Sequence, residues 1–185
     1  MEIEKIASGQ FGVVKKARHR LDGMVYAIKM TKKPLKDHSR SEKIAMKEIF
    51  AAASMMKHKH VVRYYNSWVE SGIVFIQNEY CDGGSLEASI NNHRVKQKSF
   101  SETQIRKILS DISKGLRYIH SKNLAHLDVK PDNILMTTSV DTCLDTFDVT
   151  NVTYKLADFG HIAPVYGQDD EPEEGDCRSE MKTGY

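Results

Sequence analysis

The chain has 185 residues, of which 40% are hydrophobic and 28% charged, so its composition is that of one globular domain with a core rather than of a disordered chain. A net charge of +2 is too small to indicate binding to nucleic acid. The three cysteines lie far apart and no apolar run approaches the ~18 residues of a membrane span, which argues against a disulfide framework, a zinc site and a membrane anchor.

The first half of the chain has the pattern of a β-rich unit with one helix. Alternating and β-branched residues bounded by Gly or Asp predict strands, and apolar residues at helical spacing predict the helix. The expected elements are two strands around a glycine-rich loop over 3–16, a strand over 25–29, a helix over 41–56, and two strands over 61–68 and 73–79.

The second half has mainly helical patterns. A break at 81–84 precedes a short helix that starts at Ser85, and Ser101 with Gln104 forms a capping box that opens a long helix. The apolar residues of that long helix recur on one face, which predicts that they belong to the core. They are Ile105, Ile108, Leu109, Ile112, Leu116 and Ile119.

Two short strands, 134–136 and 154–156, flank a polar insert over 137–153 that we expect to be a mobile loop. The order of elements predicts an α+β fold with two lobes and a cleft between them. We expect a β-rich lobe over 1–78, a hinge over 79–84, and a partial helical lobe over 85–185.

A glycine-rich segment over 7–14 has the pattern of a loop that covers phosphate groups, with Ala7 in place of its first glycine. Glycines allow the backbone to lie close to a ligand. A dinucleotide-binding loop would need a helix after the glycines, whereas Val13 and Val14 continue as a strand. The candidate nucleotide-binding residues of this segment are Ile6, Ala7, Ser8, Gly9, Gln10, Phe11, Gly12, Val13 and Val14.

Lys29 follows Ala27 and Ile28 on the next predicted strand, and a lysine at this place can reach the phosphates of a nucleotide. Such a lysine needs a carboxylate to fix it. Glu48 lies in the middle of the following helix and is the best candidate. Glu42 is the alternative, but it stands near the helix start, where an acid is expected for capping.

The most specific pattern is H-x-D-x-K-x-x-N, formed by His126, Asp128, Lys130 and Asn133 and followed by D-F-G at Asp158. In this arrangement Asp128 would accept the proton of a substrate hydroxyl, and Lys130 would sit near the transferred phosphate. Asn133 and Asp158 would hold magnesium. The pattern therefore resembles protein kinases, which implies ATP and Mg²⁺ as cofactors.

Several further stretches resemble the Wee family of protein kinases, and together they cover the chain from Ile3 to about Arg178. Asn78, at the back of the expected adenine pocket, is a specific mark, because most kinases carry an apolar residue there. By the same resemblance, Glu79 and Cys81 would offer hinge backbone groups to adenine and Ala27 would line the nucleotide site. The other stretches are 20–23, 26–29, 32–35, 60–64, 76–81, 83–86, 115–120, 160–161 and 173–176.

The Wee resemblance implies an enzyme that phosphorylates an inhibitory tyrosine of a cyclin-dependent kinase and so restrains mitotic entry. It also implies a nuclear location, or otherwise a cytoplasmic one. We expect a monomer that binds neither nucleic acid nor a membrane. Lys130, two residues after Asp128, is by itself the pattern of serine/threonine kinases, so tyrosine specificity rests on the resemblance alone.

Two alternatives stay open. The stretch 62–70 also resembles the translation-initiation-factor kinases, which are serine/threonine kinases. Beyond Arg178 the sequence departs from the Wee pattern, so we expect a C-terminally truncated kinase domain. Such a chain could be a non-catalytic fragment that binds a nucleotide or a partner.

Overall fold

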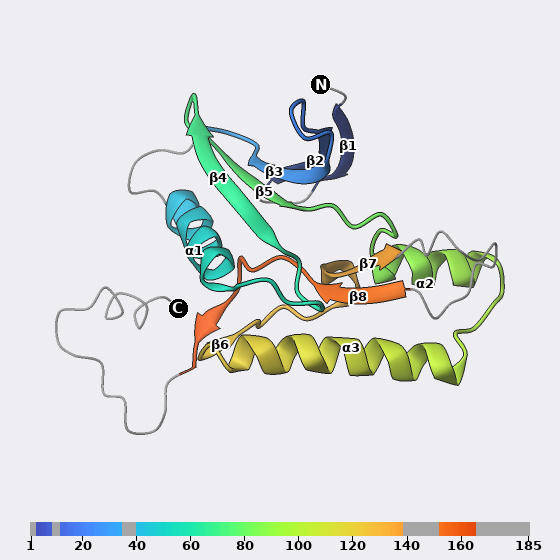
Figure 1. The fold of residues 1–185 in the computed structure, drawn as a ribbon. Helices are drawn as coiled ribbons and strands as arrows, with labels where there is room; N and C mark the ends of the chain where they lie inside the picture. Colours follow the sequence, from blue (N-terminus) through green and yellow to red (C-terminus); the bar gives the residue numbers. More distant parts are fainter. Residues whose placement is uncertain (1–2, 9–11, 35–39, 139–151, 166–185) are drawn as a thin grey trace.

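The computed structural model describes residues 3–8, 12–34, 40–138 and 152–165. A five-stranded sheet with one helix beside it forms one part, and two helices with a β-hairpin form the other (Figure 1). This arrangement confirms the expected α+β class with a β-rich first half. None of the helices in these ranges combines the length and the hydropathy that crossing a bilayer requires.

The sheet is antiparallel throughout and its spatial order is β1-β2-β3-β5-β4. The β4–β5 hairpin closes through Ser71 and Gly72, which both have positive φ (51° and 76°), as a two-residue turn requires. The strands are β1 (Ile3–Ser8), β2 (Gly12–Arg18), β3 (Val25–Thr31), β4 (Tyr64–Glu70) and β5 (Ile73–Glu79).

The helix α1 (Arg40–Ser54) packs against this sheet, where Ala45 meets Val74 and Ile76 in a small core. The helix expected over 41–56 is therefore present, with its end at Ser54. The strand expected over 61–68 was placed too early, because β4 begins only at Tyr64. Val62 instead donates its N–H to the carbonyl of Leu156, at 2.8 Å, so this segment pairs with the other half of the chain.

The second half follows the predicted order. Ser85 caps α2 (Leu86–Val95), and the predicted capping box of Ser101 and Gln104 opens α3 (Glu102–His120). The remaining elements are β6 (Leu124–Ala125), the 3₁₀ turn η1 (Pro131–Asn133), β7 (Ile134–Thr138), β8 (Val152–Leu156) and β9 (Ala163–Pro164), with β7 paired to β8 and β6 to β9.

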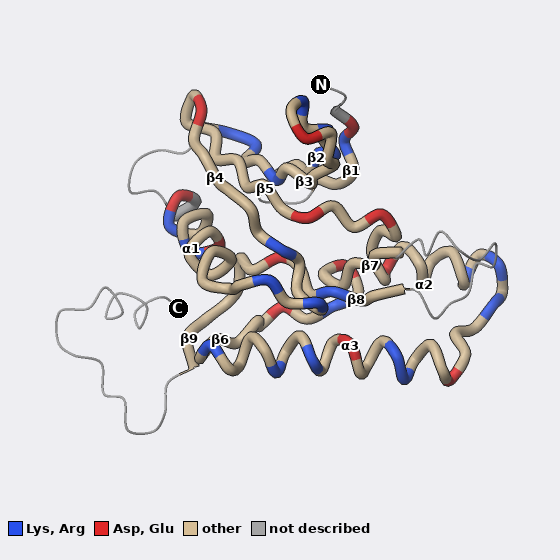
Figure 2. Tube along the Cα trace, in the orientation of Figure 1, with Lys and Arg blue, Asp and Glu red and all other residues tan. Residues whose placement is uncertain are grey.

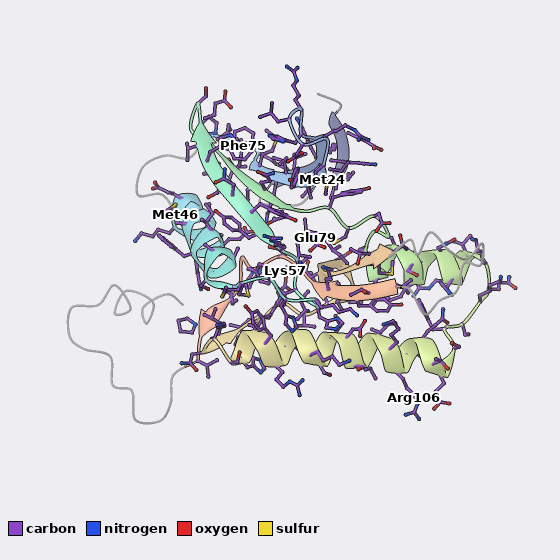
Figure 3. All side chains as sticks on the ribbon, in the orientation of Figure 1. Met24, Met46, Lys57, Phe75, Glu79 and Arg106 are labelled. Carbon is purple, nitrogen blue, oxygen red and sulfur yellow. The ribbon has the colours of Figure 1, made fainter. Side chains whose placement is uncertain are left out.

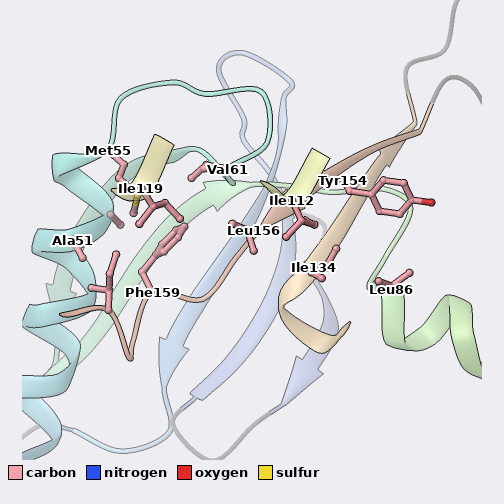
Figure 4. Close-up of a cluster of buried hydrophobic side chains, with 12 residues drawn as sticks. Ala51, Met55, Val61, Leu86, Ile112, Ile119, Ile134, Tyr154, Leu156 and Phe159 are labelled. Carbon is pink, nitrogen blue, oxygen red and sulfur yellow. The ribbon is translucent and has the colours of Figure 1, made fainter. Parts of the chain in front are cut away.

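One large core joins the two halves. Ile119 of α3 and Leu156 of β8 are fully buried at its centre. Met55, just after α1, and Phe159 belong to the same cluster (Figure 4). The same apolar contacts therefore hold α1 and the β7–β8 hairpin together. They also fix the segment before Asp158 against α1.

The predicted core face of α3 is partly wrong. Ile112 and Ile119 are buried, but Ile105 and Leu109 are 46% and 63% exposed. The reason is that α3 packs with one side against β8 and the turn before β4. At Gly115 the approach is so close that an added Cβ would lie 2.6 Å from the carbonyl oxygen of His60.

Some predictions fall outside the described ranges. The central part of the polar insert (139–151) and the stretch 173–176 belong to this group, as do the cysteines Cys143 and Cys177. Cys81 is described, and it is a buried free thiol.

Replacing Ile119 with Ala is expected to lower the free energy of unfolding by about 2–5 kcal/mol, since it leaves a cavity in the shared core. Leu109→Ala in the same helix is the matched control and should change it by less than about 1 kcal/mol, because Leu109 is exposed. Chemical denaturation of both variants measures the difference. Equal losses would contradict the placement of these two residues.

Candidate functional site

The face of the sheet that looks toward α1 carries the nucleotide-site candidates of the first half. Val14 lies opposite Lys29, and Ala27 lies opposite Asn78 in the neighbouring strand. Ala7 is paired with Val14. Directly opposite residues share a face of a sheet, so these five side chains belong to one surface.

The Lys29 ammonium connects three separate segments. Its Nζ lies 2.6 Å from Glu48 Oε1 in α1 and 3.0 Å from Asp158 Oδ1 after β8. The predicted partner Glu48 is thus the one observed. An ammonium held between two carboxylates at this point is fixed in direction, and a nucleotide phosphate is a group it can bind.

Burial and charge set the protonation of this trio. Burial opposes the charge of Lys29, but Glu48 and Asp158 outweigh it, so the pKa of Lys29 is raised. Burial raises the pKa of Glu48, and Lys29 offsets only part of this. For Asp158 burial again raises the pKa, but Lys29 outweighs burial and the net shift is downward. Lys29 therefore stays cationic and Asp158 anionic.

The catalytic-loop candidates converge on the carboxylate of Asp128. Lys130 Nζ donates to Asp128 Oδ2 at 2.7 Å and to Oδ1 at 3.0 Å. Asn133 Nδ2 donates to Asp128 Oδ2 at 2.8 Å and to its backbone carbonyl at 2.9 Å. The hydrogen bond from Lys130 is the main cause that holds the pKa of Asp128 below its usual value. Asp128 is therefore an anion near neutral pH, and its carboxylate oxygens can accept a hydrogen bond from a hydroxyl group.

His126 is a positioning residue to which the sequence analysis assigned no role. It is 1% exposed and its ring packs edge-on against Phe159. Its Nε2 lies 3.0 Å from the carbonyl of Ala157, and its Nδ1 accepts the backbone N–H of Asp128 at 3.3 Å. Burial lowers the pKa of His126, in keeping with a neutral ring that ties the catalytic loop to the segment of Asp158.

The donor set fits magnesium bound together with phosphate. Both hydrogen bonds from the Asn133 amide use Nδ2, so its Oδ1 can face a cation. The described residues hold no cluster of three His, Cys, Asp or Glu that could bind a metal alone. Mg²⁺ is commonly held by one or two protein oxygens plus substrate phosphates, and Asn133 with Asp158 would supply them here.

The glycine-rich loop is only partly described. Gly9, Gln10 and Phe11 lie outside the described residues. Ser8 and Val13 are paired with each other on the opposite face of the sheet, so only their backbone can face a nucleotide there. An added Cβ at Gly12 would lie 2.5 Å from the carbonyl oxygen of Met30, so close strand packing alone already requires this glycine.

The expected hinge leads from β5 to α2. Asn78 is half-buried in β5, and Cys81 is buried with the pKa of its thiol raised to about 12, chiefly by burial. The Glu79 N–H donates to the Arg63 carbonyl at 2.8 Å. Its side chain points to Lys155 of β8, with which it forms an ion pair.

Two contacts of the site were not predicted from the sequence. One is the Glu79–Lys155 pair, which joins residues 76 positions apart and has no local signal. The other is His161, whose Nδ1 lies 3.5 Å from Asp128 Oδ2. Its place directly after the D-F-G triplet was the available signal.

Charges of both signs are distributed over both halves of the chain (Figure 2).

Comparison with known proteins identifies the family of the chain. The family model of the protein kinase domain matches residues 1–179. The chain is 42% identical over 189 residues to Wee1-like protein kinase 2 of Sus scrofa and to that of Homo sapiens. It is 44% identical over 184 residues to Wee1-like protein kinase 1-B of Xenopus laevis. These alignments cover 96% of this chain and 30–33% of the relatives, so the chain spans about a third of their length.

Lys130→Met is expected to raise the pKa of Asp128, because the variant removes the donor that stabilises its charged form. An NMR titration of the Asp128 carboxyl carbon measures this shift directly. Arg106→Met, which breaks an exposed ion pair on α3, is the control and should leave the titration unchanged. An Asp128 pKa that stayed the same in Lys130→Met would refute the assigned contact.

Proposed function

The chain belongs to the protein kinase domain family, and on that premise we propose that it acts as an ATP-dependent kinase of the Wee type. The observation that carries the proposal is the position of Lys29, bound at once to Glu48 of α1 and to Asp158 after β8. A lysine and a metal-binding carboxylate in contact, close to a proton acceptor, suit the transfer of a phosphoryl group.

Each residue of the candidate site has its own task in this reaction. Lys29 binds nucleotide phosphate, and Glu48 holds the ammonium in place. Bound magnesium would neutralise phosphate charge at Asn133 and Asp158. Asp128 orients the attacking hydroxyl and accepts its proton, while Lys130 adds positive charge beside the transferred group. Asp128 is ready for this task because Lys130 keeps its carboxylate ionised.

The substrate we propose is an inhibitory tyrosine of a cyclin-dependent kinase, so that the enzyme restrains mitotic entry from the nucleus. The support is the Wee1-like name of the relatives and their 42–44% identity across nearly the whole chain. Lys130, which alone is typical of serine/threonine kinases, makes the identity of the phosphorylated residue the decisive readout.

The test is transfer of labelled phosphate from ATP to a catalytically inactive cyclin-dependent kinase, with phosphoamino-acid analysis of the product. We expect phosphotyrosine, and a rate about 10²- to 10⁴-fold lower in Asp128→Asn, because the variant removes the proton acceptor. Asp132→Asn makes the same chemical change on an exposed residue of the same loop and should retain the rate.

Phosphoserine or phosphothreonine as the product would overturn the Wee-type assignment in favour of a serine/threonine kinase. Binding of ATP without any transfer would mark a non-catalytic nucleotide-binding protein. Transfer that persisted at the full rate in Asp128→Asn would overturn the role of Asp128.

A further inference from the structure

The carboxylate of Glu79 and the ammonium of Lys155 form a two-contact ion pair between the end of β5 and the end of β8. Lys155 Nζ lies 2.7 Å from Oε1 and 2.9 Å from Oε2 of Glu79. Lys155 is 9% exposed although it is a lysine. Glu79 lies between the sheet and the β7–β8 hairpin (Figure 3). Neither side chain contacts Lys29 or Asp128 in the described structure, so the site described above does not require this pair for its own contacts.

The segment 61–63 is hydrogen-bonded to Glu79 and to Leu156, the residue that follows Lys155. Glu79 accepts the N–H of Arg63 through Oε2 at 3.2 Å and donates its own N–H to the Arg63 carbonyl. On the other side, Val62 donates to the Leu156 carbonyl at 2.8 Å. The hinge, the 61–63 segment and β8 therefore form one hydrogen-bonded unit, which the ion pair closes.

This hydrogen-bonded unit lies directly before Asp158, the residue proposed to bind magnesium. Lys155 stands three positions before Asp158, and the intervening backbone is fixed, since Leu156 donates to His60 at 3.0 Å and Ala157 donates to Asn133 at 2.9 Å. Glu79 and Asp158 are therefore joined by a short stretch of hydrogen-bonded backbone and one ion pair. Adenine would bind at the hinge end of this path, and magnesium with phosphate at the other end.

The energetics favour a pair that acts as a unit. A buried ammonium without a carboxylate is costly, because burial removes its hydration. Loss of either partner leaves the other unpaired, so the two single variants should have similar effects and the double variant should add little.

We propose that the Glu79–Lys155 pair is a positioning device that couples adenine binding at the hinge to magnesium-dependent phosphate binding at Asp158. The inference rests on the proposed nucleotide-binding function and assigns to it the ion pair that joins the first hinge residue to β8. Its consequence is that magnesium improves ATP affinity more when the pair is intact than when it is broken.

The experiment measures dissociation constants of the protein for adenosine, and for ATP with and without Mg²⁺. In Lys155→Met and in Glu79→Gln we expect the improvement of ATP affinity by magnesium to fall about five- to tenfold, a usual size for coupling between sites. In Lys155→Met adenosine affinity should change less than about twofold, since Lys155 lies in β8 and the hinge residues are unaltered. The double variant should match the stronger single one.

Arg106→Met breaks the exposed Glu102–Arg106 pair on α3 and is the matched control, with no expected change in any of the three constants. Lower melting temperatures with an unchanged magnesium effect would show that the pair only stabilises the fold, and this result overturns the inference alone. If the unaltered protein binds neither adenosine nor ATP, the proposed function and the inference fall together.

Discussion

The arrangement of the site depends on the charge of Lys29. Its partly buried ammonium lies between Glu48 and Asp158, and neither carboxylate is close to Lys29 in sequence. A cation that folding partly removes from water is stabilised by such partners, so Lys29 of β3 is stable in its charged form when α1 and the segment after β8 bring their carboxylates to it. The same contact leaves Lys29 directed at the place where phosphate would bind.

The apolar core supplies the rigid frame that this contact needs. Phe159 directly follows Asp158 and packs in the same cluster as Ala51 of α1 and Ile119 of α3. His126 fixes the catalytic loop to this segment through the Ala157 carbonyl and the Asp128 N–H. The charges of the site thus lie on a layer of buried residues, which explains how residues from distant parts of the sequence keep distances of 2.6–3.0 Å.

The sequence predicted those features that have a local signal or a fixed spacing. The capping box at Ser101 and the pairing of Lys29 with Glu48 are both observed. The exposure of Leu109 was not predicted, because helical periodicity does not say which side of a helix finds a partner. The late start of β4 was not predicted, because the β-prone residues Val61 and Val62 pair with Leu156 of β8 instead. The Glu79–Lys155 pair could not be predicted either, since only the folded chain brings these residues together.

The most direct test of the central claim compares the affinities of Lys29→Met for ATP and for adenosine with those of the unaltered protein. The account predicts that ATP affinity falls at least about tenfold, the loss of one charge-assisted phosphate contact, while adenosine affinity stays the same. If ATP and adenosine both kept their affinities, Lys29 would not bind phosphate, and the proposed nucleotide site would be wrong.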